Sequence, residues 1–283
     1  FRRALLAALR EPAYAKLNLA LHVRRRRDDG YHELETLFAF AEDGDQISGE
    51  VADDINLKIS GPFGEGLSST DNLVVRAAQL MQSHFAVEQG AAISLYKRLP
   101  IASGIGGGSA DAAATARLLN RLWDIGANDR ELETLLAPLG ADIPACVLSQ
   151  TVYGEGTGAA LRPVSDAEIS GRAALLVNPL QPVTTGPVFQ AWDGIDRGGL
   201  DFANPWQATL QGRNDLQAPA ISICPAISEV LDILARSDAD LVRMSGSGAT
   251  CFALYGSPEK RDATNRHIAS TCPQYWIMAS SLR

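Results

Sequence analysis

Apolar and polar side chains alternate along several short stretches of the chain, as in β-strands that bury one face. The clearest alternation covers residues 13–23, where Lys16 and Asn18 fall on the polar side. Because side chains two positions apart share a strand face, Lys16 and Asn18 are expected about 6–7 Å apart along the strand. The same pattern predicts strands over residues 34–40 and 93–99, and further strands between residues 42 and 61.

Helical spacing accounts for most of the remaining apolar residues in the first half. Asp71 is expected to cap a helix whose apolar stripe is Leu73, Ala77, Leu80 and Met81. An alanine-rich helix is predicted up to Trp123, and another helix follows residues 128–129. Pro144 favours the first position of a helix, so Asp142 is predicted just before a helix start. A carboxylate there either caps the helix or serves as a base that the helix dipole keeps ionised.

A polar stretch over residues 163–172 changes the composition and is interpreted as a domain boundary. We predict an N-terminal domain of residues 1–165 and a C-terminal domain of residues 166–283. After the boundary, the predicted order β-α-α-β-β-α-β favours a split βαβ, ferredoxin-like arrangement. Its elements are expected at residues 173–177, 185–192, 227–234, 240–244, 250–255, from 258 onward and 275–279, with a loop rich in Gly, Asp and Asn up to about residue 215.

Residues 100–111 form the most distinctive stretch, Pro-Ile-Ala-Ser-Gly-Ile-Gly-Gly-Gly-Ser-Ala-Asp, between a predicted strand and a predicted helix. Glycines let the backbone approach a ligand closely, and the N-terminus of the following helix favours an anion, most commonly phosphate. The stretch is not a P-loop, because no Gly-Lys-Ser/Thr follows, and it lacks the last glycine of the dinucleotide-binding G-x-G-x-x-G. A flexible turn without a ligand is the alternative.

The composition narrows the kinds of ligand that the chain can bind. It has 283 residues, a net charge of −8, and 46% hydrophobic and 20% charged residues, as is ordinary for a globular protein. The acidic balance argues against general binding to nucleic acids or membrane surfaces, so local donors would have to hold a phosphate. The basic run Arg24–Arg27 is interpreted as a solvated hairpin loop whose charge Asp28 and Asp29 cancel.

Cysteine and histidine usage indicates neither a metal centre nor a disulfide framework. The four cysteines lack C-x-x-C spacing and are expected to be reduced core residues, and the four histidines show no zinc-binding pattern. No apolar run approaches the ~18 residues of a membrane span, and no signal-peptide pattern is found. A cytoplasmic location is therefore expected.

Three separated stretches together resemble the GHMP kinase superfamily: Ala15-Lys16-Leu17-Asn18 with Asp29-Gly30-Tyr31-His32, the glycine-rich loop of residues 100–111, and Arg243–Thr250. Taken singly, the Asp29–His32 turn is an ordinary surface turn, and residues 245–249 form either a tight hairpin or a second anion-binding nest. Within the superfamily, the resemblance is closest to kinases of a cytidine diphosphate-linked methylerythritol, and it covers nearly the whole chain. Ala102 and Ala110 depart from it, because the family loop usually has glycine and serine there.

The resemblance implies an α+β fold of two halves, an N-terminal half like the second domain of ribosomal protein S5 and a ferredoxin-like C-terminal half. It implies an ATP- and Mg²⁺-dependent phosphotransferase that acts on the 2-hydroxyl of the methylerythritol, in the non-mevalonate pathway to isoprenoid precursors. The expected partner is this small molecule, with no nucleic acid and no membrane, and the expected state is a monomer or a weak homodimer. No metal ligand is predicted among the side chains.

The resemblance also implies roles for single residues. Asp142 would accept the hydroxyl proton, and Lys16 would keep that carboxylate ionised and stabilise developing charge. Tyr31 and Phe189 would stack on the cytosine, and His32 would contact its edge. The remaining substrate contacts would come from Asn18, Thr185, Gly246, Ser247 and Gly248. ATP contacts would come from Ser103, Gly104, Gly106, Gly107, Gly108 and Ser109 in the loop, and from Asn72 and Lys97 near adenosine.

Other functions are compatible with parts of the pattern. Another small-molecule kinase of the superfamily, of mevalonate or homoserine type, would have no use for the turn Asp29–His32. A non-catalytic nucleotide-binding regulator would need neither Lys16 nor Asp142. A nicotinamide-dependent oxidoreductase fits least, since no acidic residue follows a complete fingerprint at the required distance. The residues therefore favour the kinase of a cytidyl substrate.

Overall fold

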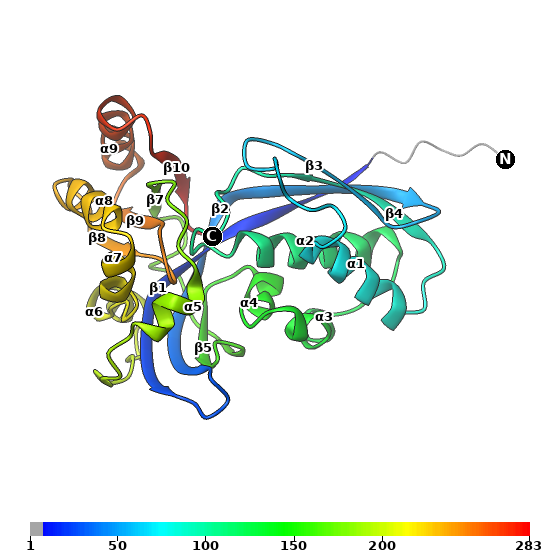
Figure 1. Cartoon of the computed structure of the whole chain (residues 1–283), viewed down its shortest axis with the longest axis horizontal. Helices are drawn as coiled ribbons and strands as arrows, with labels where there is room; N and C mark the ends of the chain where they lie inside the picture. The colour runs from blue at the N-terminus through cyan, green and yellow to red at the C-terminus, as the bar shows by residue number, and fades with distance from the viewer. Residues whose placement is uncertain (1–7) are drawn as a thin grey trace. The chain divides into compact units, whose positions relative to one another are not determined.

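The computed structural model describes residues 8–283, which Figure 1 shows as a ribbon. Its contacts divide the chain into two compact units. Unit 1 comprises the described residues up to Tyr14 with Gly44–Leu99 and Gly107–Leu148, and unit 2 comprises Ala15–Asp43, Pro100–Gly106 and Ser149–Arg283. The predicted boundary at residue 165 divides the sequence into consecutive halves, whereas both compact units are discontinuous along the chain.

Unit 1 combines three paired strand segments with a group of helices. β3 (Asn56–Ser60) pairs in parallel with β4 (Gly90–Tyr96), which pairs antiparallel with the last part of β2 (His32–Ala52). The helices are α1 (Leu73–His84), α2 (Gly107–Leu122), α3 (Asp129–Leu136) and α4 (Ile143–Leu148), with the 3₁₀ turn η1 (Ala137–Leu139) before α4. α2 packs against α1 and α4 (Figure 1). Its buried side chains include several alanines, which let neighbouring helices approach closely.

Unit 2 begins with the hairpin formed by β1 (Leu9–Arg26) and β2, two long strands that each have residues in both units. The first part of β2 pairs antiparallel with β5 (Val152–Gly156), and β5 pairs antiparallel with β6 (Ala160–Pro163). The alternation predicted for residues 13–23 and 34–40 is confirmed as strand, although both strands extend well beyond the predicted limits.

The rest of unit 2 is built on a second sheet, of four strands in the order β10-β7-β9-β8 (Figure 1). These strands are β7 (Ala173–Asn178), β8 (Leu241–Met244), β9 (Cys251–Tyr255) and β10 (Trp276–Ser281), and neighbouring strands pair antiparallel. The helices are α5 (Thr185–Gln190), α6 (Pro205–Gln211), α7 (Gln217–Ile223), α8 (Ala226–Ala235) and α9 (Pro258–Thr271). The sheet order and the element sequence confirm the ferredoxin-like prediction.

The core of unit 2 follows from the patterns of these elements. β7 and β9 are buried along their whole length, as central strands covered on both faces must be. Of the stripe predicted for α8, Ile227, Val230 and Leu234 are buried, and they belong to the same hydrophobic cluster as the strand residues. The four cysteines are free thiols, as predicted, and three of them are buried.

Two local predictions were wrong. The cap of α1 is Asn72, not Asp71, because the Asn72 side chain accepts the backbone N–H of Val74. The stretch between residue 192 and about residue 215 was predicted as loop, but it contains α6. Asn204 is the N-cap of this helix and Pro205 is its first residue. Both signals are present in the sequence, and both match the ordinary rules for helix starts.

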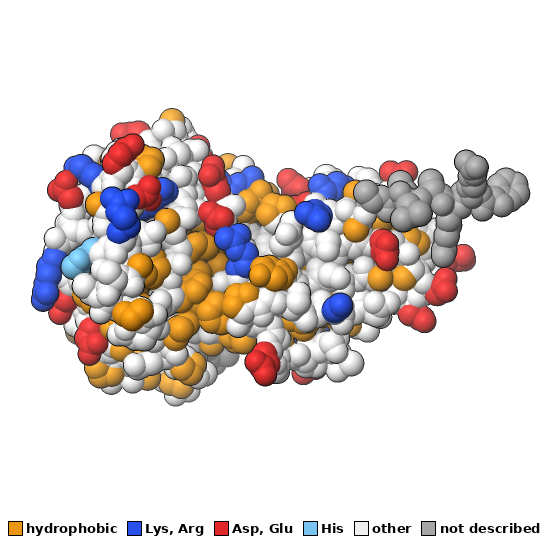
Figure 2. Space-filling model, turned by 90° about the horizontal axis from the view of Figure 1, so that it is seen from above, with side chains coloured by type: hydrophobic (Ala, Val, Ile, Leu, Met, Phe, Trp, Pro, Cys, Tyr) orange, Lys and Arg blue, Asp and Glu red, His pale blue; other side chains and the backbone are white. Residues whose placement is uncertain are grey.

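The surface agrees with the acidic composition. On the face drawn in Figure 2, the described Lys and Arg side chains lie among Asp and Glu, and no continuous basic area is seen. None of the described helices is long and apolar enough to cross a membrane.

Candidate active site

Both ends of the glycine-rich loop are fixed in unit 1 by one buried ammonium group. Lys97, just after β4, donates to Asp45 and, at 2.7 Å, to Asp111 Oδ2 in the first turns of α2. Asp45 Oδ1 in turn accepts the backbone N–H groups of Arg98 at 2.5 Å and Leu99 at 2.9 Å. The chain before the loop and the helix after it are therefore joined through three side chains.

The charges of this triad (Asp45, Lys97 and Asp111) are strongly coupled. Burial raises the pKa of Asp111 to about 7, against the opposing effect of Lys97. Burial also disfavours the Lys97 ammonium, but the carboxylates of Asp111 and Asp45 raise its pKa above the ordinary value. Lys97 is 4% exposed, so its charge is matched inside unit 1. These contacts give Lys97 a role in holding the loop, and its expected position near adenosine stays a prediction.

The loop and the second small-residue stretch lie backbone to backbone in unit 2. Gly104 has φ +75°, and a Cβ atom there would lie 2.5 Å from the carbonyl oxygen of Ser245. Gly246 has φ +55°, and a Cβ atom there would lie 2.8 Å from the carbonyl oxygen of Gly104. Ser245 Oγ donates to Gly104 O at 3.0 Å, and Thr250 N–H donates to Ser103 O at 3.1 Å. Glycine is required at both positions by left-handed φ and by this close approach.

Asp142 lies directly before α4, as predicted, and its backbone carbonyl accepts the N–H of Cys146. Ser109, in the first turn of α2, donates its hydroxyl to Asp142 Oδ1 at 2.8 Å. The structure thus brings together a serine that ends the glycine-rich loop and the carboxylate predicted to be the base. The sequence assigned Ser109 to the triphosphate and did not predict this contact.

Lys16 and Asn18 share a face of β1, as the alternation predicted, and Lys16 Nζ donates to Asn18 Oδ1 at 2.8 Å. Asn18 Nδ2 donates to Thr36 Oγ1 at 2.8 Å, and the Asn18 backbone N–H donates to Ser245 Oγ at 3.1 Å. The Lys16 ammonium also lies 5.0 Å from the centre of the Phe38 ring. The backbone N–H of Lys16 donates to Ile105 O at 2.9 Å, which joins β1 to the glycine-rich loop.

A cluster of aromatic rings surrounds His32 at the start of β2. Its ring centre lies 4.9 Å from that of Phe189 and 5.8 Å from that of Trp192, the latter edge to face. His32 Nε2 is buried and has no hydrogen-bond partner among the described residues. Burial lowers the pKa of His32, and the Arg26 charge lowers it further, so the ring is neutral near pH 7. Tyr31, which directly precedes His32 in the sequence, is 62% exposed. Trp192 is not among the residues predicted for this site.

Three more predicted residues have defined contacts. Thr185 Oγ1 lies 3.0 Å from Ser247 Oγ, which links the start of α5 to the second small-residue stretch. Asn72 accepts the N–H of Val74 and donates to Ser68 O at 3.1 Å, so its side chain forms part of the α1 cap.

Arg243, the first residue of the third motif, is buried and donates to the backbone carbonyls of Leu19, Thr209 and Gly212. Its part in the motif is therefore to hold the backbone in place.

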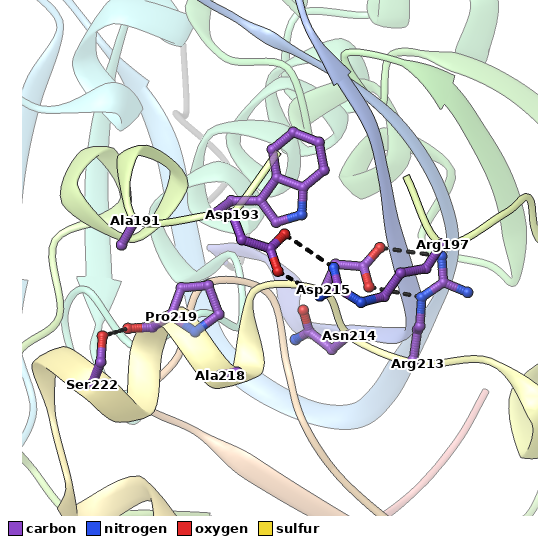
Figure 3. A pocket seen from close by; sticks show the side chains of 10 residues that line it. Ala191, Asp193, Arg197, Arg213, Asn214, Asp215, Ala218, Pro219 and Ser222 are labelled. Atoms are coloured by element: carbon purple, nitrogen blue, oxygen red, sulfur yellow. Dashed lines mark hydrogen bonds and ion pairs between the residues drawn. The ribbon is translucent and has the colours of Figure 1, made fainter. Parts of the chain in front are cut away.

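A separate cavity of about 420 Å³ in unit 2 has Trp192 in its wall. Figure 3 shows its charged side chains directed toward one another. Arg197 pairs with Asp193 at 2.5 Å, and Arg213 pairs with Asp215 at 2.7 Å. The acidic and basic groups of this cavity therefore neutralise each other.

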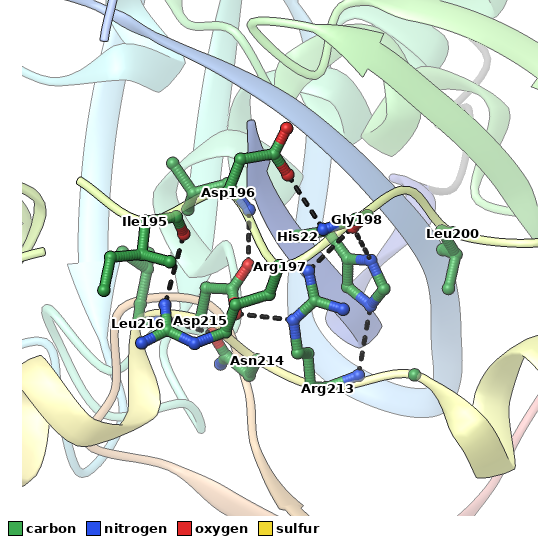
Figure 4. A network of polar contacts seen from close by, with 12 residues as sticks. His22, Ile195, Asp196, Arg197, Gly198, Leu200, Arg213, Asn214, Asp215 and Leu216 are labelled. Carbon is green, nitrogen blue, oxygen red and sulfur yellow. Dashed lines mark hydrogen bonds and ion pairs between the residues drawn. The ribbon is translucent and has the colours of Figure 1, made fainter. Parts of the chain in front are cut away.

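A polar network next to this cavity ties the segment after Trp192 to β1 (Figure 4). His22 Nε2 accepts the backbone N–H of Arg213 at 3.2 Å, and Nδ1 lies 3.2 Å from Gly198 O. Since Nε2 accepts, the proton of the neutral ring is on Nδ1 and is donated to Gly198. Arg24 pairs with Asp196 at 3.1 Å. The arginine run is thus not neutralised as predicted, because Glu33, Glu35 and Asp196 pair with it as well as Asp29.

Comparisons with known proteins agree with this geometry. The family profile "GHMP kinases N terminal domain" matches residues 72–150, and "GHMP kinases C terminal" matches residues 206–274. A 4-diphosphocytidyl-2-C-methyl-D-erythritol kinase of Sphingopyxis alaskensis is 52% identical over 281 residues, which cover 98% of this chain and 99% of the relative. The chain belongs to the 4-diphosphocytidyl-2-C-methyl-D-erythritol kinase family of GHMP kinases.

Further relatives support this assignment to the 4-diphosphocytidyl-2-C-methyl-D-erythritol kinase family. The corresponding kinase of Rhizorhabdus wittichii is 52% identical over 277 residues, covering 96% of this chain and 94% of the relative. A crystal structure of 4-(cytidine 5'-diphospho)-2C-methyl-D-erythritol kinase has a TM-score of 0.83 at 31% identity and covers 97% of this chain and 99% of that one. A homoserine kinase from Cytophaga hutchinsonii, at 16% identity and a TM-score of 0.73, shares the fold.

Ala102 departs from the pattern of the 4-diphosphocytidyl-2-C-methyl-D-erythritol kinase family at a position where the backbone is left-handed. Ala102 stands where the family loop usually has glycine, and its φ is +50°. A left-handed conformation costs an alanine about 1–2 kcal/mol, which glycine would not lose. The chain keeps the loop conformation in spite of the added methyl group, which is exposed.

Proposed function

We propose that this chain is an ATP-dependent kinase that phosphorylates the 2-hydroxyl of 4-diphosphocytidyl-2-C-methyl-D-erythritol and releases ADP. The hydroxyl oxygen forms a bond to the γ-phosphorus, the bond from that phosphorus to the β–γ bridging oxygen breaks, and the hydroxyl proton passes to Asp142. The observation that carries the proposal is the 2.8 Å hydrogen bond between Ser109 and Asp142. This hydrogen bond connects Asp142, the proposed proton acceptor, to the first turn of α2, the helix that follows the glycine-rich loop.

Positioning and charge neutralisation supply most of the catalysis in this proposal, because phosphoryl transfer needs little covalent participation by the protein. The backbone N–H groups of residues 103–109 hold the triphosphate, which lets an acidic chain bind a polyanion. The described residues contain no cluster of three or more His, Cys, Asp or Glu side chains that could hold a metal. In this proposal Mg²⁺ is carried by the triphosphate, where the Ser109 hydroxyl would be a protein ligand and the ion would neutralise phosphoryl charge.

The cytidine end of the substrate is assigned to the His32 cluster. A buried ring nitrogen without a partner is costly, and the edge of a base would supply one. Phe189 packs against His32 and, with the exposed ring of Tyr31, offers aromatic faces for stacking. Lys16 and Asn18 are assigned to the acceptor hydroxyl, and Thr185 with residues 246–248 to the rest of the substrate. Asn72 near adenosine, the cytoplasmic location and the monomeric or weakly dimeric state stay predictions.

The proposal is tested by measuring ADP release from ATP and Mg²⁺ with 4-diphosphocytidyl-2-C-methyl-D-erythritol, beside mevalonate and homoserine. We expect turnover with the cytidyl substrate alone, and a kcat at least about 100-fold lower for Asp142→Asn, because a general base is removed. ATP binding by that variant should be retained. Turnover of another alcohol would discard the cytidine site, and ATP binding without any turnover would favour a regulatory protein.

A further inference from the structure

Arg26 closes the C-terminal end of α5. Its Nη2 donates to the carbonyl oxygen of Gln190 at 2.9 Å and to that of Trp192 at 2.6 Å. The last carbonyl groups of a helix lack partners within the helix, and a cation there also complements the negative end of the helix dipole. A guanidinium bonded to two carbonyl groups is thus a charge-assisted clamp on this segment.

The clamped segment carries the rings around His32. Phe189 is in the last turn of α5, directly before Gln190, and Trp192 is the second residue that Arg26 holds. Both rings contact the His32 ring, at centre distances of 4.9 and 5.8 Å. Arg26 lies at the end of β1 and His32 at the start of β2, so the clamp joins the β1–β2 hairpin to α5.

The neighbouring arginines have other partners. Arg24 lies 3.1 Å from Asp196, and Arg27 lies 3.0 Å from Asp29. The Arg25 side chain is 69% exposed, with Glu33 at 3.7 Å. Of the four arginines, Arg26 is thus the one that donates to backbone carbonyls of the α5 segment. Arg25 offers a matched control of the same charge.

We propose that Arg26 is a positioning residue for cytosine recognition, which fixes the α5 segment so that Phe189, Trp192 and His32 keep the arrangement that receives the base. Arg26 acts through these rings and does not touch the substrate. The proposal rests on the proposed function, because it needs the cytidine end to bind at His32. The Arg26 charge additionally favours the neutral form of the His32 ring, whereas the rings that pack against it, Phe189 and Trp192, are uncharged.

The first test is steady-state kinetics of Arg26→Met beside Arg25→Met in the full chain. For Arg26→Met we expect KM for the cytidyl substrate to rise about tenfold, which corresponds to about 1.4 kcal/mol. KM for ATP and kcat should stay within about twofold of the wild type, and Arg25→Met should leave all three unchanged. Arg26→Lys should restore part of the affinity, since an ammonium can donate to the same carbonyls. Equal effects on both KM values, or an equal effect of Arg25→Met, would overturn the proposal.

A second readout needs no turnover. The His32 ring can be titrated by NMR in the wild type and in both methionine variants. Its pKa should rise in Arg26→Met and stay unchanged in Arg25→Met; an unchanged His32 titration in Arg26→Met would show that Arg26 does not act on this ring. If Arg26→Met does not fold, Arg26→Gln allows the same two measurements. Absence of wild-type turnover with the cytidyl substrate would instead contradict the proposed function itself.

Discussion

His22 is a buried histidine on β1 whose two ring nitrogens are both used, one as donor and one as acceptor. Burial lowers its pKa below 6.5, and the nearby Arg213 charge lowers it further. Protonation of Nε2 would remove the acceptor of the Arg213 N–H and place a second cation beside the guanidinium. The native state therefore favours the neutral ring, although the Asp215 carboxylate opposes this effect.

This preference predicts a pH-dependent stability. The folded-state pKa is depressed, so the unfolded chain binds the proton more readily, and stability is lost as pH falls below about 6.5. We expect the free energy of unfolding in urea to decline less between pH 7 and pH 5 in His22→Gln than in the wild type. His32 is present in both proteins, so the difference isolates His22. Parallel declines in the two proteins would contradict the assignment.

At single positions, the sequence predicted those features that depend on near neighbours. Lys16 and Asn18 share a face because strand side chains repeat every two residues, and Asp142 precedes α4 because Pro144 favours a helix start. The contacts of Lys97 could not be predicted, since its partner Asp45 is 52 residues away. Its burial follows from the packing of β2, β4 and α2, which no local pattern encodes.

At the scale of elements, the triad of Asp45, Lys97 and Asp111 links the interior of β2, the segment directly after β4 and the first turns of α2. Lys97→Met would leave two carboxylates buried without their cation. Such a loss costs about 3–5 kcal/mol of folding free energy. We expect this decrease in urea unfolding at pH 8, above the pKa of about 7 to which burial raises Asp111.

Lys58→Met provides the control, because Lys58 is an exposed lysine on the neighbouring strand β3. It should change the free energy of unfolding by less than about 0.5 kcal/mol. A Lys97→Met protein as stable as Lys58→Met would mean that the triad does not hold the loop.

Helices and strands with a strong hydrophobic periodicity, or with a clear helix-start signal, could be predicted from the sequence. The ferredoxin-like order was predicted from these elements. α6 was missed because its seven residues lie within a stretch rich in Gly, Asp and Asn, whose composition outweighed the Asn204-Pro205 start. The pairing of the arginine run with Glu33, Glu35 and Asp196 could not be predicted, because these carboxylates are brought close only by the hairpin and by the network of Figure 4.

At the scale of the whole molecule, both compact units are discontinuous along the chain, and the boundary at residue 165 stays a prediction. A fragment of residues 1–165 would contain all of unit 1. It would keep only part of unit 2, because the second sheet of unit 2 lies beyond residue 165. We expect this fragment to show no cooperative thermal unfolding by circular dichroism and no stabilisation by ADP. The full chain serves as the control. A fragment that unfolds as sharply as the full chain would establish residue 165 as a true domain boundary.

The hydrogen bonds of the glycine-rich loop also bear on how the chain is made. Ser245, whose hydroxyl bonds to Gly104 O, lies 141 residues later in the sequence. At a synthesis rate of about 5–20 residues per second, the loop leaves the ribosome on the order of ten seconds before this partner. During translation a nascent chain thus displays residues 103–104 before their partners Thr250 and Ser245 exist, so this backbone contact forms long after the loop itself is made.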